Sequence, residues 1–319
     1  MPELLQAVHK PVLEEELIRY LGPRKEAELM IDATQGEGGH SFAFLSQFPD
    51  LQIIGLDADP EIQGIARERL KEFEGRLQFF SGWAEDFFLQ YPASQRQPDT
   101  ILIDLGISLF HYEKSGRGFS FRRDEKLDMR INPYLGQSAA DLITRLSEKD
   151  LADLIYANGE EHYSRRIARE IVKARKQGPI SSSKVLAGIV EHALPSSYRS
   201  VHGATKTFMA LRIAVNEELS RLPELLKAAL RVLRTGGRMG VISFHSLEDR
   251  IVKNFFRKKN RDCICPPEEP ICRCERKRIV NFLTKKGIVP GEEEIKMNPP
   301  SRSARLRIIE KCNDEVILC

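Results

Sequence analysis

A glycine-rich turn near the N-terminus carries the residues best suited to hold a small molecule. The segment IDATQGEGGHS places Gly36, Gly38 and Gly39 after a short apolar run that ends at Asp32. It lacks the third glycine of the G-x-G-x-x-G dinucleotide fingerprint, and it lacks the Lys-Ser/Thr pair that ends a Walker A phosphate loop. The spacing therefore disfavours a triphosphate and supports a dinucleotide only weakly.

Two carboxylates flank this turn and indicate which ligand it would accept. Asp57 ends the next apolar run, where each of its oxygens can accept a hydrogen bond from one hydroxyl of a ribose. Asp32 can meet a positively charged group or fix the loop. S-adenosylmethionine has an ammonium, a sulfonium and a ribose but no phosphate, so the turn points to this cofactor. A plain strand–turn–helix with capping acids is the structural alternative.

The elements that would position these groups follow an alternating pattern. Short apolar runs predict strands over residues 29–34, 51–59, 76–82 and 98–108, with helical patterns between them. Such alternation indicates a doubly wound, mostly parallel α/β sheet of the Rossmann-like kind. A long helical stretch over 205–233 and a strand over 238–246 then resume the same sheet.

The alternation is interrupted in the middle of the chain. Residues from 114 onward are loop-like and rich in charged and aromatic side chains, and 138–194 have a helical pattern. We therefore expect an all-helical subdomain, inserted at 114–204 for substrate recognition. The first part of the core would span 1–113, and the second part, with a basic C-terminal region, would span 205–319.

Composition and charge narrow the class of protein. The chain has 319 residues, of which 41% are hydrophobic and 30% charged, and it contains no apolar stretch long enough to span a membrane. The N-terminus has no signal-peptide pattern, so we expect a cytoplasmic protein without a membrane partner. Net charge is +3, but residues 250–311 carry 17 Lys and Arg against 8 Asp and Glu. An anionic partner such as nucleic acid and a solvated mixed-charge surface both fit this bias.

Four cysteines are clustered in the segment CICPPEEPICRC, at Cys263, Cys265, Cys272 and Cys274. Thiols in a cytoplasmic chain stay reduced, so a disulfide framework is not expected. Zinc ligands are usually two to four residues apart, and the C-x-C spacing is tighter than that. A proline-rich loop with reduced thiols is therefore favoured over a zinc site, and no metal is predicted.

Nine motifs, in order, carry a resemblance that covers nearly the whole chain. They are HKPVLEEEL, DATQGEGGHS, GLDADP, DLGIS, RGFSF, LDMR, TFMALRIAVNEEL, SFHSLEDRIVK and NPPSRSARLR. Together they resemble the bacterial RsmH family, also called MraW. The resemblance implies an S-adenosylmethionine-dependent methyltransferase that acts on N4 of a cytosine in the decoding region of 16S ribosomal RNA. It also implies a methyltransferase core with an inserted helical domain.

The resemblance assigns cofactor contacts residue by residue. Asp32 and Gly36 would shape the loop, and His111 stands where the family usually has Gln. The implied cofactor-binding residues are Gly38, Gly39, His40, Asp57, Trp83, Ala84, Asp104 and His111.

Asp104, which ends the fourth predicted strand in DLGIS, is the candidate catalytic residue. The exocyclic amine of cytosine is a poor nucleophile because its lone pair is delocalised into the ring. A hydrogen-bond acceptor beside the amine would localise that lone pair as the methyl group arrives. Asp104 and the carbonyls after it are the predicted acceptors. Asp104 could instead position the cofactor or the loop.

Candidate RNA-binding residues combine aromatic rings with arginines, the usual means of holding an unstacked base and its phosphates. Core anchoring of the insertion is the alternative for the aromatic residues, and a structural histidine is the alternative for His245. Arg307 continues the alternating arginine pattern near the C-terminus. The predicted set is Arg117, Phe119, Phe121, His245, Arg302 and Arg305.

Two other functions stay open at this point. A nicotinamide dehydrogenase on the same fold is disfavoured by the broken fingerprint. A catalytically weak or inactive RNA-binding ribosome-assembly factor would keep the fold without turnover. The expected partner in the favoured case is 16S ribosomal RNA within the small ribosomal subunit, and the family precedent makes a homodimer plausible.

Overall fold

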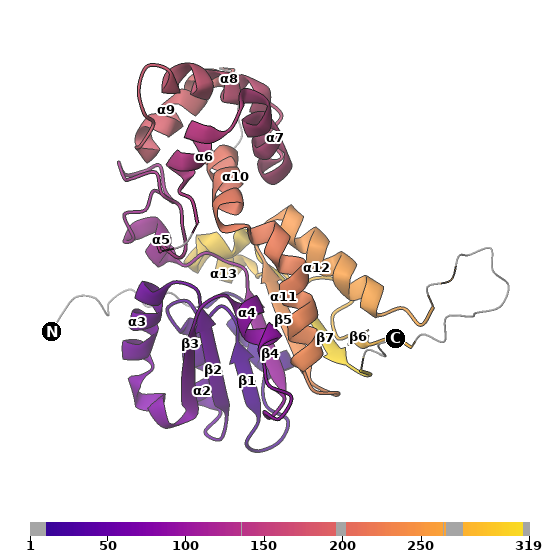
Figure 1. Ribbon diagram of the computed structural model, residues 1–319. Helices are drawn as coiled ribbons and strands as arrows, with labels where there is room; N and C mark the ends of the chain where they lie inside the picture. The colour runs from indigo at the N-terminus through magenta and orange to yellow at the C-terminus, as the bar shows by residue number, and fades with distance from the viewer. Residues whose placement is uncertain (1–10, 135, 196–201, 264, 266–276, 315–319) are drawn as a thin grey trace. The chain divides into compact units, whose positions relative to one another are not determined.

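The computed structural model describes residues 11–134, 136–195, 202–263, 265 and 277–314. The chain divides into two compact units (Figure 1). The first, here called the sheet unit, comprises Met1–Gly106 and Arg221–Cys319, and the second, the helical unit, is Ile107–Ser220. The predicted boundaries lay at 113/114 and 204/205, so the helical unit takes in more chain on each side than expected.

The sheet unit is built on one sheet, which has seven strands within the described residues, in the order β3-β2-β1-β4-β5-β7-β6. Neighbouring strands from β3 to β5 are parallel, while β7 is antiparallel to both β5 and β6. This confirms the doubly wound, mostly parallel α/β class. The strands are β1 Leu29–Asp32, β2 Gln52–Asp57, β3 Leu77–Ser81, β4 Thr100–Asp104, β5 Arg238–Ser243, β6 Val280–Phe282 and β7 Arg305–Lys311.

Both faces of this sheet are buried, which explains why its strands read as apolar runs. Along β1, Leu29 and Ile31 join one core cluster, and Met30, between them, joins another. Helices α1 (Glu14–Leu21), α2 (Gly39–Gln47) and α3 (Pro60–Arg69) contribute to the cluster of Met30. Helices α4 (Ala84–Leu89), α11 (Glu218–Val232) and α12 (Ser246–Lys259) contribute to the other.

The helical unit has a core of its own. Apolar side chains at helical spacing, including Ile143, Ile155, Ile167 and Leu186, are fully buried together. Ser138 begins the first of the larger helices with a capping box, in which its hydroxyl accepts the backbone N–H of Asp141. The helices are α5 Leu109–Glu113, α6 Ala139–Arg145, α7 Glu148–Gly159, α8 Ser164–Arg175, α9 Ser183–Ala193 and α10 Thr205–Asn216.

The structure corrects several predicted boundaries. The expected continuous helix over 205–233 is broken, because Glu217 adopts a left-handed conformation with φ of 53° between α10 and α11. Strands β1 and β4 end at Asp32 and Asp104, the acids at which the sequence placed their ends. Strand β6 was not predicted. The smaller elements are α13 Glu292–Met297 and the 3-10 turns η2 Lys71–Arg76 and η3 Pro299–Ser303. Among the described residues, no helix combines the length and apolar character that crossing a membrane requires.

Asp99 lies just before β4, at the end of the sheet where β1 and β4 begin. Its contacts hold this end of the sheet together. Its side chain is 1% exposed, accepts the N–H of Leu29 at 3.0 Å, and pairs with Lys25, Arg96 and Arg234. Burial by itself raises the pKa of Asp99, but the Leu29 N–H and the cations outweigh it and lower that pKa below its ordinary value.

Asp99→Asn is therefore expected to lower the free energy of unfolding by about 1–3 kcal/mol at pH 7, because it weakens a buried, charge-assisted network. A carboxylate whose pKa is depressed in the folded state stabilises the fold above its unfolded pKa of about 3.9. That contribution disappears as pH falls through the folded pKa. Urea unfolding of both proteins at pH 7 and near pH 3 measures this. An equal difference at both pH values would contradict the assignment.

Candidate functional site

The site forms at the edge of the sheet where the parallel strands end. Strands β1, β2 and β4 terminate in Asp32, Asp57 and Asp104, respectively. Strand order reverses at β1 and β4, which are neighbours in the sheet although β2 and β3 lie between them in sequence. Open α/β sheets bind ligands at such a reversal, beyond the carboxyl ends of the strands. The topology therefore brings the three predicted acidic residues to one ligand-binding edge.

The glycine turn connects β1 to α2 and depends on left-handed backbone. Gly36 has φ of 54° and Gly38 has φ of 80°, and α2 begins at Gly39. A Cβ on Gly38 would also lie 2.8 Å from Cδ1 of Leu70. A Cβ on Gly36 would meet no atom within 4 Å, so this glycine is required by conformation alone. The turn thus leads into a helix N-terminus with little side-chain bulk over it.

Asp57 fixes the turn from the neighbouring strand. One carboxylate oxygen accepts the N–H of Gly36 at 2.8 Å, and the other accepts the N–H of Asp59 at 2.8 Å. The residue is half-buried. A carboxylate is the kind of group that accepts hydrogen bonds from the hydroxyls of a ribose.

Asp32 is sealed beneath the turn and acts on the loop. It is 1% exposed, and it accepts a hydrogen bond of 2.7 Å from the hydroxyl of Ser41. The amide of Gln35 donates in turn to Ser41 at 3.2 Å. Burial raises the pKa of Asp32, against the opposing effects of His40 and Ser41. Of the two roles considered for Asp32, this geometry favours shaping the loop over meeting a charged ligand.

Sequence analysis missed the close contact between Gln35 and Gly55 that lets Gln35 join this network. Gln35 packs so tightly over Gly55 that a Cβ there would lie 2.0 Å from its side-chain nitrogen. A glycine inside a strand often marks such a close approach, and Gly55 within the apolar run of β2 is that signal. Thr34 was also missed; its hydroxyl accepts the N–H of Asp104 at 2.6 Å.

His40 and Asp104 form the central pair of the site. Nε2 of His40 lies 3.1 Å from Oδ2 of Asp104, and their side chains are 10% and 16% exposed. Burial lowers the pKa of His40, but the hydrogen bond and charge of Asp104, together with the charge of Asp32, raise it above its ordinary value. The other oxygen of Asp104 accepts the N–H of Gly106 at 2.8 Å. The structure thus joins two residues that sequence analysis listed only as separate cofactor contacts.

Trp83 and Ala84 follow β3 on the same edge. The N–H of Gly82 donates to the carbonyl of Asp57 at 2.8 Å, which ties this segment to β2. The guanidinium of Arg221 lies 4.5 Å from the centre of the Trp83 ring and pairs with Glu85. The Trp83 side chain is half-buried. Ala84 is buried at the start of α4.

A family model described as the MraW methylase family matches residues 6–312. The chain belongs to the MraW methylase family. Three relatives are each named "Ribosomal RNA small subunit methyltransferase H". That of Treponema denticola is 54% identical and aligns over 96% of this chain and 98% of its own length. That of Syntrophobacter fumaroxidans is 45% identical over 95% and 96%, and that of Treponema pallidum is 40% identical over 95% and 92%.

Within this MraW methylase family member, four predicted residues fall in the helical unit. His111 is buried, and its ring centre lies 5.0 Å from that of Phe119, which is 5% exposed. Arg117 is 8% exposed and donates to the carbonyl of Ile131 at 2.8 Å. Phe121 stacks on the ring of His202 at 4.2 Å. These contacts favour the core-anchor alternative for Phe119, while RNA binding by the group stays a prediction.

The remaining predicted residues lie in the sheet unit. Nδ1 of His245 accepts the N–H of Glu248 and so caps α12, which favours its structural alternative. Arg307 is 8% exposed and forms two hydrogen bonds with Asp249, at 2.7 and 3.0 Å, so its charge is already used inside the fold. Arg302 and Arg305 are exposed; Arg302 lies in η3, and Arg305 begins β7.

The cysteine cluster of this family member is described only in part. Cys263 and Cys265 are free thiols, and Cys272 and Cys274 lie outside the described residues. The interpretation of this segment as a loop with reduced thiols therefore stays a prediction.

Gly38→Ala is expected to destabilise the protein by about 1–3 kcal/mol, because alanine is strained at φ of 80° and its Cβ meets Leu70. Gly64→Ala is the matched control, since Gly64 lies in α3, is exposed and has open space around it. That variant should gain up to about 1 kcal/mol. Urea unfolding of the two variants measures the contrast, and equal stabilities would rule out the strained turn.

Proposed function

We propose that this protein is an S-adenosylmethionine-dependent methyltransferase that methylates N4 of one cytosine in the decoding region of 16S ribosomal RNA. The observation that carries the proposal is the Asp104–His40 pair beside the glycine turn, in a chain of the MraW methylase family. The similarity to proteins named as small-subunit ribosomal RNA methyltransferases supports the substrate class.

The residues at the sheet edge fit S-adenosylmethionine. Gly36, Gly38 and Gly39 would line its methionine portion, Asp57 would accept hydrogen bonds from its ribose, and Trp83 would pack against its adenine. Asp104 is a partly exposed carboxylate of the site and lies beside the turn. When bound, the cofactor supplies an electrophilic methyl group on a sulfonium.

Asp104 would act on the cytosine amine through its accepting oxygens. Each oxygen has one partner, the N–H of Gly106 or the ring of His40, and each keeps a second acceptor position. A hydrogen bond from N4 to this carboxylate localises the nitrogen lone pair. Methylation would leave N4 with one proton to lose, and this proton would pass to Asp104 or to water.

His40 would keep Asp104 oriented during this step. The raised pKa of His40 favours its protonated form, which donates a charge-assisted hydrogen bond to a carboxylate. That bond would hold the carboxylate of Asp104 in position beside the amine. Orientation of a reacting group at near-attack distance is a large part of enzymatic rate enhancement.

The wider assignments belong to the same proposal. The helical unit would recognise substrate, and Arg302 and Arg305 would contact RNA phosphates. His111 would contribute to the cofactor site. A small-subunit substrate, a homodimer and a cytoplasmic location are further expectations.

The test is transfer of tritium from labelled S-adenosylmethionine to small ribosomal subunits from a strain that lacks the enzyme. Wild type should label one cytosine at N4. Asp104→Asn and Asp104→Ala should lower the rate by at least about 100-fold, the usual minimum for losing a positioned acceptor, while cofactor affinity measured by calorimetry is retained.

Each alternative result has a definite meaning. Loss of cofactor binding in the Asp104 variants would make Asp104 a binding residue and move the acceptor into the following loop. Cofactor binding by wild type without label on subunits or free RNA would overturn the enzyme assignment and support the inactive assembly factor.

A further inference from the structure

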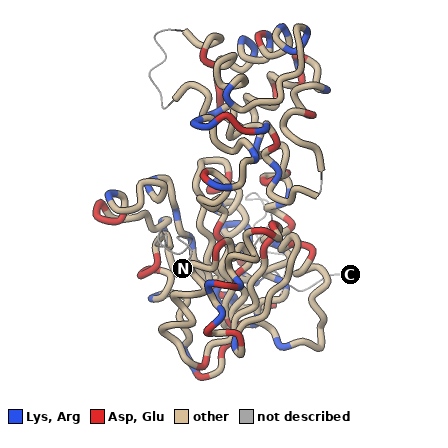
Figure 2. Tube along the Cα trace, turned by 90° about the vertical axis from the view of Figure 1, so that its left-hand side faces the viewer, with Lys and Arg blue, Asp and Glu red and all other residues tan. Residues whose placement is uncertain are grey.

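Helix α8 in the helical unit exposes a strongly basic face. Its buried side consists of Ser164, Ile167, Ala168 and Ile171. The opposite side is charged, and Figure 2 shows Lys and Arg following one another along this helix at the top of the view. The basic residues of α8 are Arg165, Arg166, Arg169, Lys173 and Arg175, against a single acid, Glu170.

Most of these cations are not used by the fold. Arg175 is the exception, because it donates to the carbonyls of Ile143 and Leu146. Arg165 and Arg166 are exposed and have no ion-pair or hydrogen-bond partner in the described part of the chain. Arg169 and Lys173 have carboxylates only at 3.8 Å, and their side chains are 68% and 69% exposed. Such exposed pairs contribute little to stability, so these four side chains are available to an anion.

Three of the four cations form a line along the helix, and Arg166 lies beside it. Arg165, Arg169 and Lys173 are four residues apart, which places them on one face of the helix at intervals of about 6 Å along its axis. A linear array of positive charge suits a polyanion, whose negative charges also repeat along a line.

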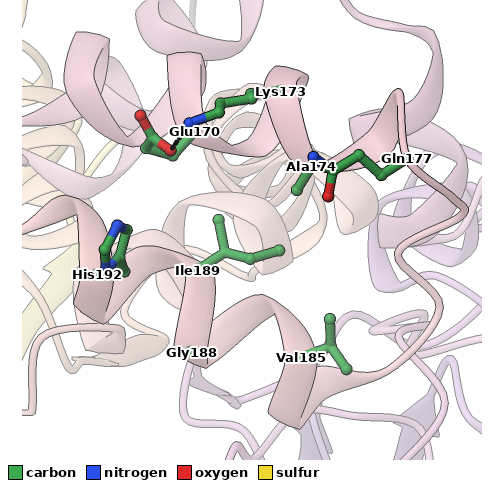
Figure 3. Close-up of a pocket in the computed structure, with 8 residues that line it drawn as sticks. All are labelled: Glu170, Lys173, Ala174, Gln177, Val185, Gly188, Ile189 and His192. Atoms are coloured by element: carbon green, nitrogen blue, oxygen red, sulfur yellow. Dashed lines mark ion pairs between the residues drawn. The ribbon is translucent and has the colours of Figure 1, made fainter.

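A groove lies beside this line, between α8 and α9, with a volume of about 450 Å³. Its α9 side is formed by Val185, Gly188 and Ile189, and the side chains of Val185 and Ile189 point toward α8 (Figure 3). Glu170, Lys173, Ala174 and Gln177 line the other side, and His192 completes the lining. The groove therefore combines an apolar surface with polar groups, among them the amide of Gln177, which can both donate and accept hydrogen bonds.

We propose that this face is an RNA-binding surface. The cations of α8 hold the backbone phosphates of a single-stranded segment of ribosomal RNA, and the groove receives one unstacked base of that segment. Single-stranded RNA needs both features, a cationic track and a surface for an exposed base. An acidic protein segment would need only the first. The inference rests on the proposed ribosomal RNA substrate and adds a contact outside the cofactor site.

The charge arm of the test is Arg165→Gln with Arg166→Gln in the full-length protein. Binding of a fluorescein-labelled oligouridine is measured by anisotropy over a series of salt concentrations. Two lost phosphate contacts should weaken binding about tenfold and reduce the slope of log affinity against log salt by about 1.4. Lys71→Gln with Lys227→Gln, two exposed lysines of the sheet unit, removes the same charge and should leave both quantities unchanged.

The groove arm is Gly188→Leu. Gly188 is exposed within α9, and a Cβ there meets no atom within 4 Å, so leucine fits and is the better helix former. The added side chain fills the groove without altering charge. Oligouridine affinity should fall several-fold while the salt slope stays at the wild-type value, and the thermal midpoint should not fall.

The outcomes separate this inference from the proposed function. The RNA-binding surface is ruled out if the charge variant keeps the affinity and salt slope of wild type and Gly188→Leu keeps the affinity of wild type. This holds even if wild type methylates small subunits. If the variants lose binding to the small subunit but bind oligouridine and free 16S RNA as wild type does, the face contacts a ribosomal protein and the RNA-binding inference is overturned. Failure of wild type to methylate would overturn the proposed function, whereas the oligouridine comparison would still decide the surface.

Discussion

A carboxylate without access to water must find its hydrogen bonds inside the protein, and the glycine turn is organised around one such group. One oxygen of Asp32 accepts a hydrogen bond from Ser41 in the first turn of α2, and the amide of Gln35 donates to that hydroxyl from within the loop. Gln35 reaches this position only because Gly55 leaves space on β2. The position of the loop is therefore set from beneath, by contacts that a ligand would not touch.

The three acids at the sheet edge share a chemical type but differ in environment. Asp32 is sealed, Asp57 holds backbone N–H groups from two segments, and Asp104 is paired with a histidine and partly open. Environment rather than residue type distinguishes these three acids. The same distinction applies to arginines, since Arg307 is neutralised by Asp249 whereas Arg165 is not.

Local patterns predicted the fold well because the forces that choose strands and helices act over a few residues. The strand runs, the acids at their ends and the interrupting helical segment were all legible in the sequence. The helix break at Glu217 was not, because a glutamate gives no signal for a left-handed backbone. The His40–Asp104 pair joins residues 64 positions apart, and its partners emerge only when β1 and β4 lie side by side. The residue types of Arg117 and His245 fit RNA contact as well as they fit a structural role. Only the hydrogen bonds observed for these two residues favour the structural role.

The interruption of the sheet by the helical unit also constrains the order of events during synthesis. The helical unit is one continuous segment, Ile107–Ser220, and its core can close as soon as that segment has left the ribosome. Strand β4 must wait for β5, which pairs Arg238 with Thr100 across that whole segment. Until then the growing chain carries four strands with an apolar, unpaired edge, the kind of surface that invites aggregation. The interruption of the sheet thus leaves β4 with an unpaired edge while the helices fold first.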